Sequence, residues 1–163
     1  MEIKKIKMGV ISDTHLDHYN DKLKQCVSEH FKDVDIIVHA GDMVDFCVLD
    51  VFRDKEIKAV CGNMDNDSVR KKFPEQLFFD INGFQFALVH GWGSPWDLED
   101  KLSARFKGVD CIIYGHTHKP ANHERDGILF FNPGSAADRV VNSSQTVGIL
   151  EIDKEIVGKI VKI

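Results

Sequence analysis

The 163-residue sequence predicts an α/β fold in a single domain that spans residues 1–163. Two patterns predict it. Through the first two thirds of the chain, short β-type runs alternate with helical stretches, which is typical of βαβ units and a largely parallel sheet. In the last third, β-type runs come in pairs around short turns, which indicates antiparallel hairpins. A domain of this size buries roughly 70% of the surface that its unfolded chain exposes, so it needs no disulfides for stability.

The first part of the chain is predicted to build the parallel strands. Short apolar runs predict strands at Ile6–Ile11, Ile36–Ala40 and Lys58–Cys61. Patterns of helical period lie between them, near Asp21–Phe31 and Val44–Arg53. Helical crossovers of this kind place consecutive strands in one sheet with the same direction.

Hairpins dominate the prediction for the rest of the chain. The dipeptide Asn82-Gly83 separates two apolar runs, 77–81 and 84–89, and is a strong hairpin signal. A short helix is expected from Pro95 to Phe106 and a buried strand from Asp110 to Tyr114. Two further hairpins are expected: residues 120–125 and 128–132 flank Asp126-Gly127, and residues 146–152 and 156–163 flank residues 153–155.

Composition narrows the range of functions. The formal net charge of −5 argues against charge-driven binding to a long polyanion, so a nucleic acid polymer is not an expected partner. The four cysteines lie singly in or beside apolar runs, which indicates reduced thiols and a cytoplasmic location. The apolar run near the N-terminus, Met8–Ile11, is far too short for a signal peptide or a membrane span, and no membrane partner is expected.

Residues of metal-ligand type follow five of the strand-like runs. They are, in chain order, Asp13-Thr14-His15, Gly41-Asp42, Gly62-Asn63, His90-Gly91 and Gly115-His116-Thr117-His118. In an open α/β sheet, ligands bind in the crevice outside the carboxyl ends of the strands, so these segments can converge there. Any one of them has an ordinary explanation as a helix cap or a turn. Five at five strand ends make coincidence improbable.

The residue types in these segments suit divalent metal ions. Aspartate offers hard oxygens, histidine a borderline nitrogen and asparagine a carbonyl oxygen, a mixture suited to Mn²⁺, Fe²⁺, Zn²⁺, Ni²⁺ or Co²⁺. Ligand type does not select among these metals, because availability and geometry decide more than intrinsic affinity. Mn²⁺ is the expected ion, with Ni²⁺, Zn²⁺, Fe²⁺, Co²⁺ or Mg²⁺ as the alternatives. Seven ligands are too many for one tetrahedral ion. Two ions about 3.5–4 Å apart that share a carboxylate would use them all, and such a pair is the usual clamp for in-line displacement at phosphorus.

The five segments resemble, in the same order, the motifs D-x-H, G-D, G-N-H-[DE], H and G-H-x-H of the calcineurin-like metallophosphoesterases. The resemblance extends from Asp13 to Ser135, and the chain is most similar to the small single-domain bacterial and archaeal phosphodiesterases of that family. It implies a four-layer αββα sandwich in which helices flank two mixed β-sheets. It also implies two ligand sets that share Asp42 as the bridge: Asp13, His15, Asp42 and His118 for one ion, and Asp42, Asn63, His90 and His116 for the other.

The implied reaction is the hydrolysis of a small phosphodiester. A hydroxide that bridges the two ions is expected to attack phosphorus, with Asp42, Asn63 and His116 as the catalytic ligands. One position departs from the family pattern, because Met64 stands where most members have a histidine that stabilises charge or protonates the leaving oxygen. Methionine can do neither, so leaving groups that depart unprotonated should be favoured.

Three further residues are candidates for supporting the site or contacting substrate. His39 lies inside a predicted strand and is expected to be a satisfied structural histidine that can orient a ligand. Asp65 ends the third motif and is expected to support the site or to contact substrate. Trp92 follows His90 closely and fits two interpretations equally well, a wall against a nucleobase or aryl group and an anchor for the next helix.

Other functions stay open at this point. The retromer subunit of the same fold is a protein-interaction scaffold, in which altered metal-site residues accompany the loss of catalysis. Here all seven ligand positions are intact, which favours an enzyme. A nuclease is a second alternative, although nucleases of this family carry added domains, and a phosphomonoesterase is a third. The resemblance also implies that strand edges and apolar patches can join copies of the chain, so a homodimer or a higher homo-oligomer is an open expectation.

Overall fold

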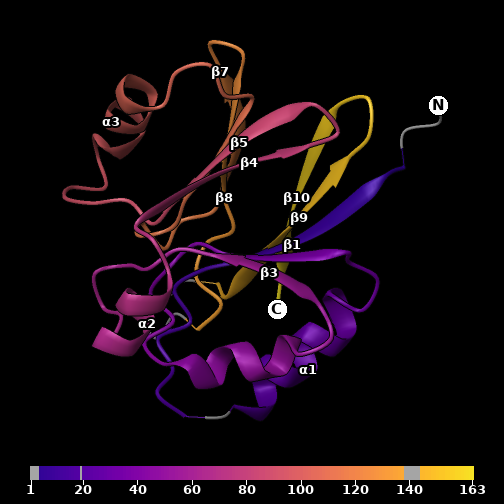
Figure 1. Ribbon diagram of the computed structural model, residues 1–163, viewed down its shortest axis with the longest axis vertical. Coiled ribbons are helices and arrows are strands. Elements are labelled where there is room, and N and C mark those ends of the chain that lie inside the picture. Colours follow the sequence, from indigo (N-terminus) through magenta and orange to yellow (C-terminus); the bar gives the residue numbers. More distant parts are fainter. Residues whose placement is uncertain (1–3, 19, 138–143) are drawn as a thin grey trace.

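In the computed structural model, which describes residues 4–18, 20–137 and 144–163, the strands form two five-stranded sheets. The first sheet has the order β10-β9-β1-β2-β3, and the second has the order β4-β5-β6-β8-β7. Helices lie against the outer sides of the sheet pair, with α1 and α3 at opposite ends of the stack (Figure 1). The expected sandwich of two mixed sheets is confirmed. The predicted single domain over residues 1–163 stays a prediction, since residues 1–3, 19 and 138–143 lie outside the described residues.

The first sheet combines the N-terminal strands with the last hairpin. Its strands are β1 (Ile6–Ile11), β2 (Ile36–His39), β3 (Glu56–Ala59), β9 (Thr146–Ile152) and β10 (Ile156–Lys162). β1, β2 and β3 are parallel, as predicted. β9 runs antiparallel to both β1 and β10, so the last hairpin extends the sheet on the side of β1.

The second sheet contains the middle of the chain. Its strands are β4 (Gln76–Ile81), β5 (Phe84–Val89), β6 (Cys111–Ile113), β7 (Ala121–Arg125) and β8 (Ile128–Asn132). β5, β6 and β8 are parallel, and β4 and β7 are antiparallel strands at the two edges. The two predicted hairpin turns are confirmed, because both residues of Asn82-Gly83 and of Asp126-Gly127 have positive φ, as a type I′ turn requires.

One prediction about helices was wrong, and one helix was not predicted. The helices are α1 (Asp21–His30), the 3₁₀ helix η1 (Phe46–Phe52), α2 (Asp67–Lys72) and α3 (Leu98–Arg105). The predicted helix over Val44–Arg53 is only the 3₁₀ helix, since Val44 has a φ of 77° and cannot be helical. The helix α2 was not predicted, because its six residues are too few to show a hydrophobic period. No helix in the described part of the chain is long and apolar enough to cross a bilayer.

Successive side chains of each strand point to opposite faces of the sheet, so the buried residues form three layers of hydrophobic core. In β1, Met8 and Val10 face the second sheet, whereas Ile11 faces the helices. Gly9 also faces the helices, and a Cβ there would lie 2.9 Å from the ring of Phe31. In β5, alternate residues pack between the sheets and against α3 in the same way. Because every central strand is covered on both faces, the strand ends are the natural place for an open site.

Candidate metal centre

The loops that follow β1, β2, β5 and β6 are joined by backbone hydrogen bonds beyond the strand ends. Within the first sheet, the N–H of Asp13 donates to the carbonyl of Gly41 at 3.0 Å, and that of His15 donates to Asp42 at 3.1 Å. Within the second sheet, the N–H of Gly115 donates to the carbonyl of His90 at 3.0 Å. These bonds hold the ligand loops in register at the edge where the two sheets meet.

One group of possible metal ligands consists of Asp13, His15 and His118. Nε2 of His15 lies 3.2 Å from Nε2 of His118, and Nε2 of His118 lies 3.2 Å from Oδ1 of Asp13. Asp13 is fully buried, while both imidazoles are about a third exposed. The group therefore has a buried carboxylate as its base and two imidazoles at its open side.

The second group consists of Asp13, Asp42 and His90. Nε2 of His90 lies 3.2 Å from Oδ2 of Asp42 and 3.9 Å from Oδ1 of Asp13. Asp13 belongs to both groups, whereas Oδ2 of Asp42 is 3.9 Å from Nε2 of His15 in the first group. Five of the seven predicted ligands thus meet within two adjoining clusters.

The two remaining predicted ligands, Asn63 and His116, lie beside these clusters. The ring of His116 is 5.3 Å from that of His90, measured between centroids. Its Nε2–H donates to the carbonyl of Gly93 at 2.8 Å, which leaves Nδ1 as the ring nitrogen able to bind a metal. Asn63 is exposed and lines a cavity together with His90. Metal binding by its amide oxygen stays a prediction, since the two clusters consist of carboxylate and imidazole groups alone.

The backbone at these positions is unusual. Five of the predicted ligands have positive φ, in a region that residues other than glycine rarely adopt: Asp13, His15, Asp42, His116 and His118. Such conformations cost about 1–3 kcal/mol each and concentrate at functional sites. Neighbouring glycines make room, since a Cβ on Gly62 would lie 2.2 Å from Oδ1 of Asp42, and one on Gly115 would lie 2.1 Å from Oγ of Ser12.

The carboxylate of Asp65 joins two loops of the candidate metal centre. Its buried carboxylate accepts backbone hydrogen bonds from Asp42 at 3.0 Å, Val44 at 2.6 Å and Gly62 at 2.6 Å. These three N–H groups belong to the loops after β2 and β3. One side chain therefore ties the Asp42 loop to the Asn63 loop.

His39 is also structural in its contacts. It is fully buried, its Nδ1 accepts the N–H of Gly41, and its Nε2 lies 3.2 Å from Oγ1 of Thr14. Burial lowers the pKa of His39 to about 4, so the ring is neutral at pH 7. It therefore orients the two loops that carry the aspartates, as expected for a satisfied histidine.

Three further residues, Ser12, Asn132 and Ser135, support the loops of the candidate metal centre through hydrogen bonds. Oγ of Ser12 donates to Oδ2 of Asp13 at 2.6 Å, and Oγ of Ser135 donates to the carbonyl of Asp13 at 2.8 Å. Nδ2 of Asn132 donates to the carbonyl of Gly115 at 3.0 Å. Asn132 ends β8 and Ser135 follows in the turn after it, and the sequence Asn132-Pro133-Gly134-Ser135 predicts such a tight turn beside the site.

The charges of the site favour a bound cation. Burial would raise the pKa of Asp13, but three surrounding imidazoles outweigh it and hold that pKa well below its ordinary value. The pKa of Asp42 is lowered as well, against the effect of burial, chiefly by His90. Burial lowers the pKa of His90, but the two carboxylates outweigh it and raise the pKa. Two ionised carboxylates within a cage of imidazoles are a donor set that divalent metals accept.

Three buried side-chain atoms lack hydrogen-bond partners in the described part of the chain, and the two that belong to the candidate metal centre fit this interpretation. Oδ1 of Asp13 and Nε2 of His90 are both buried, and neither makes a hydrogen bond of acceptable geometry. Leaving a buried polar atom without a partner costs about 1–3 kcal/mol. Nδ1 of His90 donates to the carbonyl of Ala40 at 2.8 Å, which fixes Nε2 as the unprotonated nitrogen of the neutral ring. A metal ion bound by both atoms would satisfy them.

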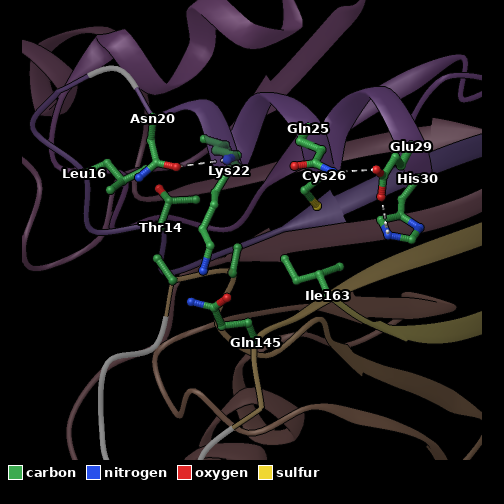
Figure 2. A pocket seen from close by; sticks show the side chains of 13 residues that line it. Thr14, Leu16, Asn20, Lys22, Gln25, Cys26, Glu29, His30, Gln145 and Ile163 are labelled. Carbon is green, nitrogen blue, oxygen red and sulfur yellow. Dashed lines mark hydrogen bonds and ion pairs between the residues drawn. The ribbon is translucent and has the colours of Figure 1, made fainter.

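A separate cavity of about 510 Å³ lies between α1 and the C-terminal end of the chain. Figure 2 shows Thr14 and Leu16 on one side of it, residues of α1 above, and Gln145 and Ile163 opposite. None of the seven predicted ligands lines this cavity as described. The candidate site is therefore defined by the clustered ligand atoms and not by this cavity.

A four-layer αββα fold with Asp and His clusters at the shared edge of its sheets defines a class, the metal-dependent hydrolases of this architecture. The chain matches the calcineurin-like phosphoesterase superfamily domain over residues 6–155, and it belongs to this family. It is 34% identical to a probable metallophosphoesterase from Methanothermobacter thermautotrophicus over 154 residues, which cover 91% of this chain and 87% of that protein.

Solved structures show the same fold. A novel archaeal phosphodiesterase superposes with a TM-score of 0.79 at 26% identity, covering 97% of this chain and all of that one. Vps29 from Entamoeba histolytica in complex with Zn²⁺ superposes with a TM-score of 0.66 at 24% identity, covering 96% of this chain and 99% of that one. The second likeness establishes the fold alone. The chain is thus a phosphoesterase-family hydrolase whose Asp and His clusters can hold divalent metal.

Proposed function

We propose that this protein is a two-metal phosphodiesterase that hydrolyses small phosphodiesters. The observation that carries the proposal is the pair of ligand clusters joined at Asp13, whose Oδ1 is buried without a hydrogen-bond partner among the described residues. Two adjoining clusters that share a carboxylate suit two ions better than one. The expected ligand sets, with Asp42 as the bridge, stay part of this proposal.

Divalent ions bound here would supply an acidified water as nucleophile and stabilise charge on the phosphoryl oxygens. The protein holds the ligands with little freedom, because Asp65 ties the Asp42 loop and Ser12 orients the carboxylate of Asp13. Asp42, Asn63 and His116 are proposed as the catalytic ligands. Asn63 is exposed and His116 is partly exposed, so a phosphoryl group can approach both.

Position 64 favours acidic leaving groups. The side chain of Met64 is 57% exposed and has no proton to give. Its backbone N–H nevertheless donates to Oδ1 of Asp42 at 2.8 Å, so the position still supports the site. General-acid assistance is worth about 10²- to 10⁴-fold, and this chain lacks the usual group for it. A nitrophenolate leaving group needs no such assistance and is the right choice for a first assay.

The remaining proposals concern the size of the substrate, the cellular location and the metal. The net charge of −5 favours a small substrate over a long polyanion. All four cysteines are free thiols, three of them buried, which fits the proposed cytoplasmic location. Manganese is the proposed metal, and the assay below compares it with the alternatives.

The test is hydrolysis of bis(p-nitrophenyl) phosphate and p-nitrophenyl phosphate by EDTA-treated protein supplied with Mn²⁺, Ni²⁺, Zn²⁺ or Mg²⁺. We expect metal-restored cleavage of the diester, weak cleavage of the monoester, and loss of both in Asp42→Ala. Asp54→Ala, at an exposed aspartate between η1 and β3, is the matched control and should keep full activity. Metal bound at two ions per chain without hydrolysis of either ester would overturn the proposal in favour of an interaction scaffold.

A further inference from the structure

A cavity of about 300 Å³ opens beside the metal centre and is shared with it through Asn63 and His90. Its volume is at the lower end of the range for small-molecule sites, roughly 300–1,000 Å³. The rest of the lining comes from α2, the start of β4, the loop after β5 and the end of α3. It is therefore placed to receive the part of a substrate next to the phosphoryl group.

Two arginines give this cavity positive charge, although the chain as a whole has a negative net charge. Arg70 and Arg105 line it, and Glu75 is the acidic residue of its described lining. A guanidinium group matches a phosphate group in shape and charge and can bind it through two parallel hydrogen bonds. In a chain with a net charge of −5, two arginines beside a proposed phosphoryl site indicate an anionic ligand.

Both arginines are held in place by the protein. Nε of Arg70 donates to the carbonyl of Asp65 at 2.8 Å, and its Nη2 donates to the carbonyl of Asn63 at 2.6 Å. Nη2 of Arg105 donates to Oε1 of Gln76 at 2.9 Å. A side chain that is already ordered loses less entropy when it binds a ligand.

Trp92 forms an apolar wall of the same cavity. The guanidinium of Arg105 lies 5.2 Å from the centre of the Trp92 ring, and the indole is still 36% exposed. An exposed indole beside a fixed guanidinium offers an apolar surface and a charge to one ligand. Trp92 thus both lines the cavity and contacts α3 through Arg105, so the pocket wall and the helix anchor both stay predictions.

We propose that this cavity binds a second phosphate, carried on one ester substituent of the substrate, with the Trp92 ring against the organic part between the two phosphates. A terminal phosphate carries a charge near −2 at neutral pH, which two guanidinium groups can balance. The substrate class is then small phosphodiesters that bear a phosphomonoester close to the scissile bond. This inference rests on the proposed function, because it assigns a subsite to the same metal centre.

The first test compares two chromogenic esters with the same scissile bond, the p-nitrophenyl ester of thymidine 5′-phosphate with and without a 3′-phosphate. We expect kcat/KM to be at least about tenfold higher with the 3′-phosphate, as for one charge-assisted hydrogen bond. Arg105→Gln should remove most of this preference. Arg53→Gln, at an exposed arginine after η1, should keep the preference.

The second test measures binding without catalysis. In a Trp96→Phe background Trp92 is the only tryptophan, so its fluorescence can follow titration with thymidine 3′,5′-bisphosphate or thymidine 5′-phosphate in Mn²⁺. We expect the bisphosphate to bind more tightly by about tenfold, and Arg105→Gln to remove the difference. Equal affinities, or a difference that survives Arg105→Gln, would overturn the subsite.

The two tests separate the subsite from the proposed function. Cleavage of both thymidine esters at equal rates, with no effect of Arg105→Gln, would leave the phosphodiesterase standing and overturn the second-phosphate site. Tighter, Arg105-dependent binding of the bisphosphate without cleavage of any diester would support the cavity and overturn the proposed activity.

Discussion

Asp65 shows how much of the metal centre depends on one residue that binds no metal. Its carboxylate accepts three backbone N–H groups from two different loops and is 5% exposed. Those loops carry Asp42 and Asn63, and Asp42 has positive φ. A strained conformation persists only where the surroundings over-determine it, and Asp65 is a large part of those surroundings.

The Asp65→Asn variant tests this role at the residue scale. The amide would replace one acceptor oxygen with an NH₂ group that faces N–H donors, so at least one buried donor loses its partner. We expect the free energy of unfolding to fall by about 1–3 kcal/mol in metal-free protein, measured by urea denaturation. Asp54→Asn, an exposed control, should change it by less than about 0.5 kcal/mol. Equal stabilities of the two variants would show that Asp65 is dispensable.

At the scale of elements, the short helix α2 couples the metal centre to the proposed subsite. It begins after Asn66, whose Oδ1 accepts the N–H of Val69 at 3.0 Å. Nδ2 of the same residue donates to Asp45 at 3.0 Å. One turn into the helix, Arg70 bonds back to the carbonyls of Asn63 and Asp65. The position of the third motif, Gly62-Asn63-Met64-Asp65, thus depends on where α2 begins.

Two helix caps provide a matched pair of substitutions. Asn20 caps α1 as Asn66 caps α2, with Oδ1 accepting the N–H of Leu23 at 3.0 Å. Loss of an asparagine cap costs about 1 kcal/mol, so both Asn20→Ala and Asn66→Ala should lower the free energy of unfolding by about that amount. Only Asn66→Ala should also weaken Mn²⁺ binding, measured by calorimetry, because only α2 holds the Asn63 loop. An equal effect of both variants on Mn²⁺ affinity would contradict this coupling.

At the scale of the whole molecule, the candidate metal centre draws its residues from both sheets. Asp13 and Asp42 come from the first sheet, while His90, His116 and His118 come from the second. An ion bound by ligands from both sheets stabilises the folded state over the unfolded chain, in which those ligands are far apart. A bound ion would add to the stability, since without it Oδ1 of Asp13 and Nε2 of His90 are buried without hydrogen-bond partners.

Metal binding should consequently be visible as thermal stability. At a Mn²⁺ concentration 100 times the Kd, we expect a gain of about 2.7 kcal/mol, or a rise in Tm of about 5–10 °C, that EDTA reverses. His90→Ala should abolish most of this rise. His30→Ala, at the end of α1, should keep it. A metal-induced shift that is the same in wild type and His90→Ala would show that the ions bind elsewhere.

Much of the fold could be predicted because it depends on local patterns. The alternation of apolar residues located the strands, and the dipeptides Asn82-Gly83 and Asp126-Gly127 located two hairpin turns. Both signals depend on only a few neighbouring residues. The helix α2 and the 3₁₀ character of η1 escaped prediction, since a short helix leaves no periodic signal and Val44 takes its φ from tertiary contacts. The bounds of β3 also moved, from the predicted Lys58–Cys61 to Glu56–Ala59.

The sequence by itself determined the family and the residue types of the metal centre, because five ordered motifs of ligand-type residues are written directly in the chain. Only the tertiary structure decided that Asp13 belongs to both clusters, that Asp65 supports the loops, and that Arg70 and Arg105 meet across one cavity. These are contacts between residues distant along the chain, and they depend on how the two sheets and the loops at their ends pack. Local sequence patterns do not encode such contacts, because they form only when the chain has folded.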